Sequence, residues 1–162
     1  MSIEESAQAS DRVVVGVDGS KPSHEALRWA RFMADVTGST LEVTMVWQWI
    51  SAYGAGAAGW AAFPPDWNPA EEARRVLTDT VAEVFGPTTP EGMIMTVREG
   101  GAAHTLIEMS GGARMLVVGS RGHGGFAGLL LGSVSAACAE HANSPVLVIH
   151  GMTPPPPPPS SA

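Results

Sequence analysis

Hydrophobic positions follow two patterns that alternate along the chain. Short runs of apolar, mostly β-branched residues are separated by longer stretches in which apolar residues return every three or four positions. Short unbroken runs are typical of buried parallel strands, and the longer spacing is typical of helices that bury one face. The pattern predicts strands at 13–17, 41–47, 93–98, 115–119 and 146–150, and helices within 26–38 and at 69–85, 102–110 and 133–142.

Strands that alternate with helices in this way indicate a single α/β domain. Right-handed crossovers between parallel strands place helices on both faces of the sheet. We therefore expect a five-stranded parallel sheet of the doubly wound, Rossmann-like kind over residues 13–150. Residues 1–12 are polar without a period, and residues 151–162 contain an unbroken run of prolines, so both ends are expected to be disordered.

The composition excludes several classes of function. The chain has 162 residues, a formal net charge of −7, 44% hydrophobic residues and 15% charged residues, which suits one globular domain. Such an acidic chain offers no basic surface for nucleic acid, and no apolar run reaches the roughly 18 residues of a membrane span. The single cysteine, Cys138, excludes an internal disulfide and, together with an N-terminus that lacks a secretory signal, favours the cytoplasm. Lys21 is the only lysine and precedes Pro22, which excludes a P-loop.

A glycine-rich segment between the fourth strand and the last helix carries the chemistry. Gly119-Ser120-Arg121-Gly122 leaves the strand, and Gly132-Ser133-Val134-Ser135 opens the helix. Glycines let the backbone approach a ligand closely, and the free N–H groups and dipole of a helix N-terminus attract phosphate. Serine hydroxyls and the forked guanidinium of Arg121 add donors for phosphate oxygens. The segment therefore predicts a phosphate-binding loop.

A dinucleotide fingerprint is the rival interpretation of the same segment. Gly122, Gly124 and Ala127 match its spacing, and Glu140 lies downstream. That fingerprint follows the first strand of its unit, and its acidic residue stands at the end of a strand. Here the glycines follow the fourth predicted strand and Glu140 falls within a helix, so the phosphate loop is favoured.

The spacing Gly119-x2-Gly122-x9-Gly132-Ser133 resembles the nucleotide-binding signature of the ATP-binding branch of the universal stress protein family. The segments 14–20 and 144–148 are similar to the first strand with its turn and to the last strand of that family, so the resemblance covers about residues 13–150. It implies an adenine nucleotide alpha hydrolase-like fold, ATP as the ligand, alone or with Mg²⁺, and a homodimer through the last strand.

The resemblance also implies roles for the residues at matching positions. It implies that Asp18 holds the ribose or the adenine and that Gly16 and Val17 line the base pocket. It also implies that the backbone near Val46 contacts the adenine. It implies that Gly119, Arg121 and Gly122 face the ribose and phosphates. It implies that the phosphates are held by Gly132, Ser133, Val134 and Ser135. A turn residue that satisfies its own backbone is the alternative for Asp18. The sequence departs from the family at Gly100-Gly101-Ala102, where Gly-Asp-Pro is common, and at Ala113-Arg114-Met115, which lacks an Asp.

Other features leave alternatives open. The aromatic residues of segment 48–67 either cover a ligand or partner, or hold the loop against the domain. The five histidines show no metal-ligand spacing, which argues against a structural zinc site, and the proline run offers a possible site for a partner with an aromatic groove.

No nucleophile with its base, and no carboxylate pair placed for hydrolysis, is recognisable in the sequence. The sequence therefore predicts an ATP-binding regulatory protein rather than a fast enzyme, with weak ATP hydrolysis as the enzymatic alternative. A role in the stress response is what the resemblance implies. A sensor of AMP or cyclic AMP, and a partner-recruiting protein with incidental nucleotide binding, are the other hypotheses.

Overall fold

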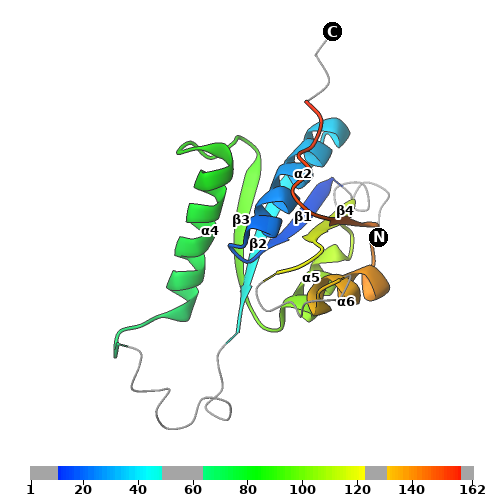
Figure 1. Ribbon diagram of the computed structural model, residues 1–162. Coiled ribbons are helices and arrows are strands. Elements are labelled where there is room, and N and C mark those ends of the chain that lie inside the picture. Colours follow the sequence, from blue (N-terminus) through cyan, green and yellow to red (C-terminus); the bar gives the residue numbers. More distant parts are fainter. Residues whose placement is uncertain (1–10, 49–63, 123–130, 158–162) are drawn as a thin grey trace, which may run out of the picture.

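A computed structural model describes residues 11–48, 64–122 and 131–157, and its centre is one parallel sheet (Figure 1). The sheet has five strands in the order β3-β2-β1-β4-β5, and every neighbouring pair is parallel. The strands are β1 (Arg12–Val17), β2 (Thr40–Trp47), β3 (Met93–Glu99), β4 (Met115–Gly119) and β5 (Val146–Ile149). The predicted α/β fold with a five-stranded parallel sheet is confirmed.

The helices lie in two layers, one on each face of the sheet. They are α2 (Lys21–Thr37) and α4 (Pro69–Phe85) on one face, and α5 (Ala102–Ser110) and α6 (Ser133–His141) on the other. From β1 the chain first adds strands toward one edge of the sheet and then toward the other. Right-handed crossovers therefore place the two pairs of helices on opposite faces. The direction reverses between β1 and β4, so the topological switch point lies there.

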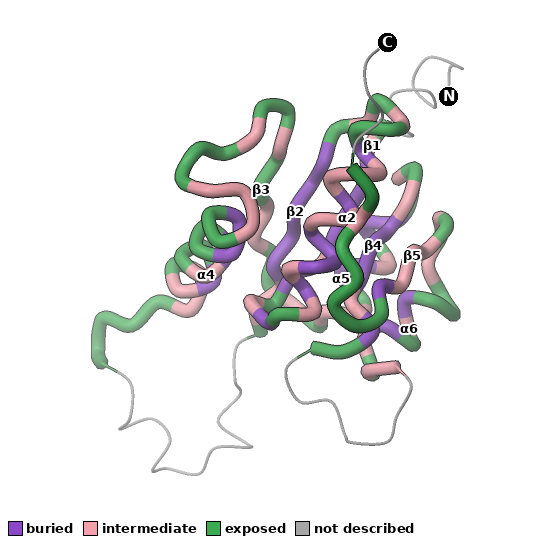
Figure 2. The backbone as a smooth tube through the Cα atoms, turned by 45° about the horizontal axis from the view of Figure 1, so that its top comes forward, coloured by how far each residue is buried: buried purple, intermediate pink, exposed green. Residues whose placement is uncertain are grey.

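Side-chain alternation along β1 divides the core into two clusters. Val13, Val15 and Val17 belong to the cluster beneath α2 and α4, whereas Val14 belongs to the cluster beneath α5 and α6. Figure 2 shows that the buried backbone is concentrated in β1, β2 and β4. Gly16 follows on the α5 side of β1, and because it has no side chain, Leu106 of α5 can pack closely on the strand there.

The helix ends follow local capping rules. Asn68 caps α4 by accepting a hydrogen bond from the backbone N–H of Ala70 at 3.0 Å, as expected for Asn followed by Pro at a helix start. The first helix begins at Lys21, five residues before the first apolar position of its predicted stripe, because Ser20 serves as the N-cap and Pro22 fits the first turn. No helix in the described ranges is long and apolar enough to cross a membrane.

The described part of the proline-rich end returns along α2 (Figure 1). The indole N–H of Trp29 donates a hydrogen bond to the carbonyl oxygen of Thr153 at 2.8 Å, and Trp29 also packs edge-to-face against Phe32. The limits predicted for the disordered ends stay a prediction. Most of the aromatic segment, residues 49–63, lies outside the described residues.

Candidate functional site

A cavity of about 300 Å³ opens at the carboxyl ends of β1, β2 and β4, where the switch point predicts a ligand. The residues to which the family resemblance gives a role all line it, namely Gly16, Val17, Asp18, Val46, Gly119, Arg121, Gly122, Gly132, Ser133, Val134 and Ser135. The structure therefore brings together residues from the two halves of the chain. Their roles toward a ligand stay a prediction.

Five further residues line the cavity and were missed by sequence reasoning: Ser23, Thr44, Ala102, Leu106 and Val118. Thr44 stands two positions before Val46 on the same face of β2, so the strand period alone pointed to it. Ala102 and Leu106 are four residues apart on one face of α5. No signal in the sequence shows that this face covers the end of β1.

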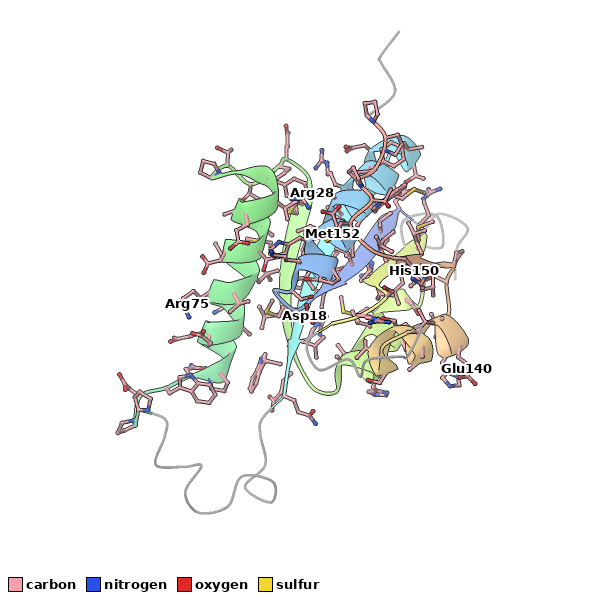
Figure 3. The ribbon with its side chains drawn as sticks, viewed as in Figure 1. Asp18, Arg28, Arg75, Glu140, His150 and Met152 are labelled. Carbon is pink, nitrogen blue, oxygen red and sulfur yellow. The ribbon has the colours of Figure 1, made fainter. Side chains whose placement is uncertain are left out.

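Asp18 stands directly after β1, where Figure 3 labels it, and lines the cavity. Its Oδ1 accepts hydrogen bonds from the backbone N–H of Ser20 at 3.0 Å and from the Ser20 hydroxyl at 2.5 Å. Its Oδ2 faces Gly122, and an ideal Cβ on Gly122 would lie closer than 3.0 Å to that oxygen. One carboxylate oxygen thus organises the turn, as the turn hypothesis expects, and the other lies against the glycine motif.

The glycine segment is closed at its base by a backbone hydrogen bond. The N–H of Gly132 donates to the carbonyl oxygen of Ser120 at 2.7 Å, which joins the end of β4 to the start of α6. Gly132 is the N-cap of α6 and provides no side-chain hydrogen bond, so the N–H groups of the first turn have no side-chain acceptor. Because Gly132, Ser133 and Val134 all line the cavity, the positive end of this helix faces it.

The two serines of α6 are placed differently. Ser133 lies in the first turn and lines the cavity. Ser135 is 4% exposed, and its hydroxyl donates to the carbonyl oxygen of Gly119 at 2.5 Å. That bond uses the hydrogen that Ser135 could otherwise offer to a phosphate, and it fixes the first turn of α6 to the end of β4.

Two of the glycines have packing reasons of their own. A Cβ on Gly119 would lie 3.1 Å from the carbonyl oxygen of Pro22, so this glycine allows the first turn of α2 to pack on β4. A Cβ on Gly16 would lie 2.6 Å from Cδ1 of Leu106. Gly16 thus allows Leu106 of α5 to pack directly on β1 at the inner end of the cavity.

Two helix N-termini and a cation meet at the cavity. Arg121 is the cation and Asp18 the carboxylate among the described lining residues, and the first turn of α5 also reaches the cavity through Ala102. The N-cap of α5, Gly101, again makes no side-chain hydrogen bond, because Gly stands where an Asp would cap the helix. Two helix N-termini therefore contribute positive potential to one cavity.

Groups outside the cavity carry less chemistry. No cluster of three His, Cys, Asp or Glu side chains that could hold a metal ion occurs within residues 11–48, 64–122 and 131–157. Cys138 is fully buried in α6, and burial raises the pKa of its thiol to about 11, so it is a core residue rather than a nucleophile. Glu140 lies on α6 and not at the end of a strand (Figure 3), which argues further against the dinucleotide fingerprint.

Comparison with known proteins agrees with this arrangement. The model of the universal stress protein family matches residues 9–150. A universal stress protein of Mycolicibacterium smegmatis is 32% identical over 150 residues, which cover 86% of this chain and 48% of the relative. The chain thus spans about half the length of the curated relatives it matches.

Solved structures show the same fold. The universal stress protein UspA from Lactobacillus plantarum superposes with a TM-score of 0.66 at 21% identity, over 85% of this chain and 96% of that one. A universal stress protein in complex with cAMP superposes with a TM-score of 0.55 at 27% identity, over 86% of this chain and 96% of that one. From its sequence, its fold and the residues gathered at the switch point, the chain belongs to the universal stress protein family.

Proposed function

We propose that the cavity binds ATP and that the chain acts as a nucleotide-binding regulatory protein. The observation that carries this proposal is the N-terminus of α6, which opens into the cavity next to Arg121 without a side-chain cap. Backbone N–H groups, a hydroxyl and a guanidinium in one place suit the phosphates of a nucleotide.

The cavity offers a place for each part of a nucleotide. The phosphates would lie against the N–H groups of Ser133 and Val134, within reach of the Ser133 hydroxyl and Arg121. The ribose hydroxyls would meet Oδ2 of Asp18, the carboxylate oxygen that does not serve the Ser20 turn. The base would enter between Gly16 and Val46, where the walls are apolar. Bound Mg²⁺ would neutralise the phosphates and be held chiefly by their oxygens.

A regulatory role fits the lining better than rapid hydrolysis. Asp18 is the carboxylate among the described lining residues, and its Oδ1 is engaged by Ser20. A general base needs an acceptor atom within reach of the attacking water. In this proposal Oδ2 of Asp18 meets the ribose instead, and the described lining contains no other carboxylate and no histidine. We expect ATP turnover, if measured, to be slow enough that bound nucleotide survives purification.

A cyclic nucleotide is the second candidate ligand. The specific support is the neighbour at 27% identity whose structure is a complex with cAMP. A cyclic phosphate carries one negative charge and needs fewer donors than a triphosphate. Competition between ATP, AMP and cAMP therefore separates the candidates, and tighter binding of ATP in the presence of Mg²⁺ supports the first.

We further propose that two copies associate through β5. This strand stands at the edge of the sheet, and Val146, Leu147 and Val148 are only partly buried. An unpaired strand edge with apolar side chains is a template for a second copy. The proline run beyond it has the composition of a ligand for a partner with an aromatic groove.

The experiment begins with purified protein that is denatured and analysed for released small molecules by mass spectrometry. The emptied protein is then titrated with ATP, AMP and cAMP, with and without Mg²⁺. Release of ATP in near-stoichiometric amount, or tight rebinding with Mg²⁺, supports the proposal. Release of cAMP or AMP instead of ATP indicates that this nucleotide is the ligand of the cavity. Absence of any nucleotide binding contradicts both candidates.

A further inference from the structure

Thr44, in the middle of β2, carries a hydroxyl that the protein itself does not use. The residue is 0% exposed, and its Oγ1 has no hydrogen-bond partner. A buried hydroxyl without a partner destabilises a fold by about 1–3 kcal/mol. Other buried hydroxyls nearby, those of Ser23 and Ser135, each donate to a backbone carbonyl. The orphaned hydroxyl of Thr44 therefore needs an explanation.

The position of Thr44 places it at the inner end of the cavity. Val43 and Met45 belong to the core cluster beneath α2 and α4, so strand alternation directs Thr44 to the opposite face, where it lines the cavity. Its partner in register on β1 is Gly16, which has no side chain. The position that a side chain of Gly16 would occupy is filled by Leu106, whose Cδ1 would lie 2.6 Å from a Cβ there, so Leu106 packs directly on this part of β1.

The surroundings favour a donor role for this hydroxyl. Apart from Thr44, the inner walls are apolar, formed by Leu106 and Val118, which are both 3% exposed. The first turn of α5 reaches the same cavity through Ala102, and its N-cap supplies no side-chain acceptor. The positive end of that helix favours a ligand atom with a lone pair over one that carries a hydrogen.

We propose that Thr44 is a specificity-determining residue whose hydroxyl donates a hydrogen bond to a ring nitrogen of the bound base. This inference rests on the proposed nucleotide binding and adds to it the group that selects the base. The hydroxyl has no hydrogen-bond partner in the free protein and gains one when the bound base presents an acceptor to it. Such a base therefore binds more tightly than one without an acceptor at this position. Ligands that lack the acceptor leave the hydroxyl and the apolar walls unmatched.

The test compares the full chain with Thr44→Val, which keeps the shape and removes the hydroxyl, and with Thr44→Ser, which restores it. ATP and its 1-deaza, 3-deaza and 7-deaza analogues, each lacking one ring acceptor, are titrated by calorimetry. We expect Thr44→Val to bind ATP roughly tenfold more weakly and Thr44→Ser to remain within about threefold of wild type. One deaza analogue should bind wild type roughly tenfold more weakly than ATP and bind Thr44→Val as well as ATP does.

Thr96→Val is the matched control. Thr96 is the register partner of Thr44 on β3, its hydroxyl donates to Glu42 at 2.8 Å, and it does not line the cavity. Its loss should leave affinity for every analogue unchanged. Thermal melting without ligand adds a second readout, because removal of an unpaired hydroxyl should keep or raise the melting temperature of Thr44→Val.

Each outcome has a distinct meaning. If wild type binds ATP and Thr44→Val binds it equally, with the same order of deaza analogues, the Thr44 inference is overturned while nucleotide binding stands. A lower melting temperature of Thr44→Val with unchanged affinity overturns it as well, and indicates an internal water on the hydroxyl. If wild type binds none of the nucleotides, the proposed function fails and the Thr44 inference fails with it.

Discussion

Replacing Gly122 with alanine should weaken ATP binding, because the added methyl group meets the carboxylate that faces it. An ideal Cβ at this position would lie closer than 3.0 Å to Oδ2 of Asp18. Asp18 is held in place, since its Oδ1 accepts hydrogen bonds from both the backbone and the hydroxyl of Ser20. Either those bonds break or the backbone at residue 122 moves away.

Both responses have a cost that can be stated. Ordinary van der Waals contact requires the methyl carbon and the carboxylate oxygen to separate by roughly 1 Å more. Rotation of Asp18 sacrifices hydrogen bonds to a charged acceptor, each of which contributes about 1.5–3 kcal/mol. Retreat of the backbone instead moves the residue 122 segment relative to the ligand. Either response moves a group that the proposal assigns to the ligand, and loss of one hydrogen bond to the ligand worth about 1.4 kcal/mol raises the Kd for ATP about tenfold.

Gly101→Ala is the control, because it makes the same change at a helix N-cap outside the described cavity lining and without a collision. Nothing lies within 4 Å of a Cβ on Gly101, and its φ of −72° suits any residue. Calorimetric titration with ATP and Mg²⁺ should show Gly101→Ala within about threefold of wild type. Thermal melting verifies that both variants fold. Equal affinity of Gly122→Ala and wild type, or equal losses at the two glycines, would refute the reasoning from the Asp18 contact.

Three further predictions concern reactivity and stability. Because burial raises the pKa of the Cys138 thiol to about 11, iodoacetamide at pH 8 should label it slowly in the folded protein and quickly after unfolding. As pH rises, the thiol of the unfolded chain loses its proton before the buried thiol does. The contribution of Cys138 to the free energy of unfolding is therefore complete below about pH 9 and is lost toward pH 11. Urea unfolding should show a decrease in the free energy of unfolding of up to about 3 kcal/mol over this range, and Cys138→Ala should abolish the decrease. Leu77→Ala removes a side chain of α4 that is 1% exposed and packs in the core, so it should lower the free energy of unfolding by about 2–5 kcal/mol. A loss below about 1 kcal/mol would show that α4 contributes little to the core. Asn68→Ala should reduce stability by about 1 kcal/mol in the same assay, because it removes the acceptor for Ala70, whereas Asn68→Asp should retain it; equal losses would contradict the capping role.

Local patterns predicted the strands and most of the helices to within one residue at each end. Unbroken apolar runs and glycine or proline stops define those elements over a few neighbouring residues, so no tertiary information is needed. The first helix is the exception, since its beginning at Lys21 depends on a cap from Ser20 and on Pro22, and its opening turn carries no apolar stripe. Helix starts are fixed by caps as much as by hydrophobic spacing.

The site was predictable only where the motif is contiguous in sequence. The glycines and serines at the two ends of the glycine segment predict a phosphate loop, and the resemblance to the family adds Asp18 and Val46. The strand period could have pointed to Thr44, but threonine in a strand is usual, and only the structure shows that its hydroxyl is buried without a hydrogen-bond partner. The contact between Asp18 and Gly122 likewise joins segments far apart in the chain.

The hydrogen bond between Gly132 and Ser120 has a consequence for the tolerance of this joint to mutation. Both of its atoms belong to the main chain, so most side-chain substitutions at either residue leave the donor and the acceptor in place. The bond fastens the end of β4 to the start of α6, and both neighbours, Gly119 and Ser133, line the cavity. Proline at position 132 is the exception, because it has no N–H to donate. The joint therefore depends on the amide hydrogen of residue 132 more than on the identity of its side chain.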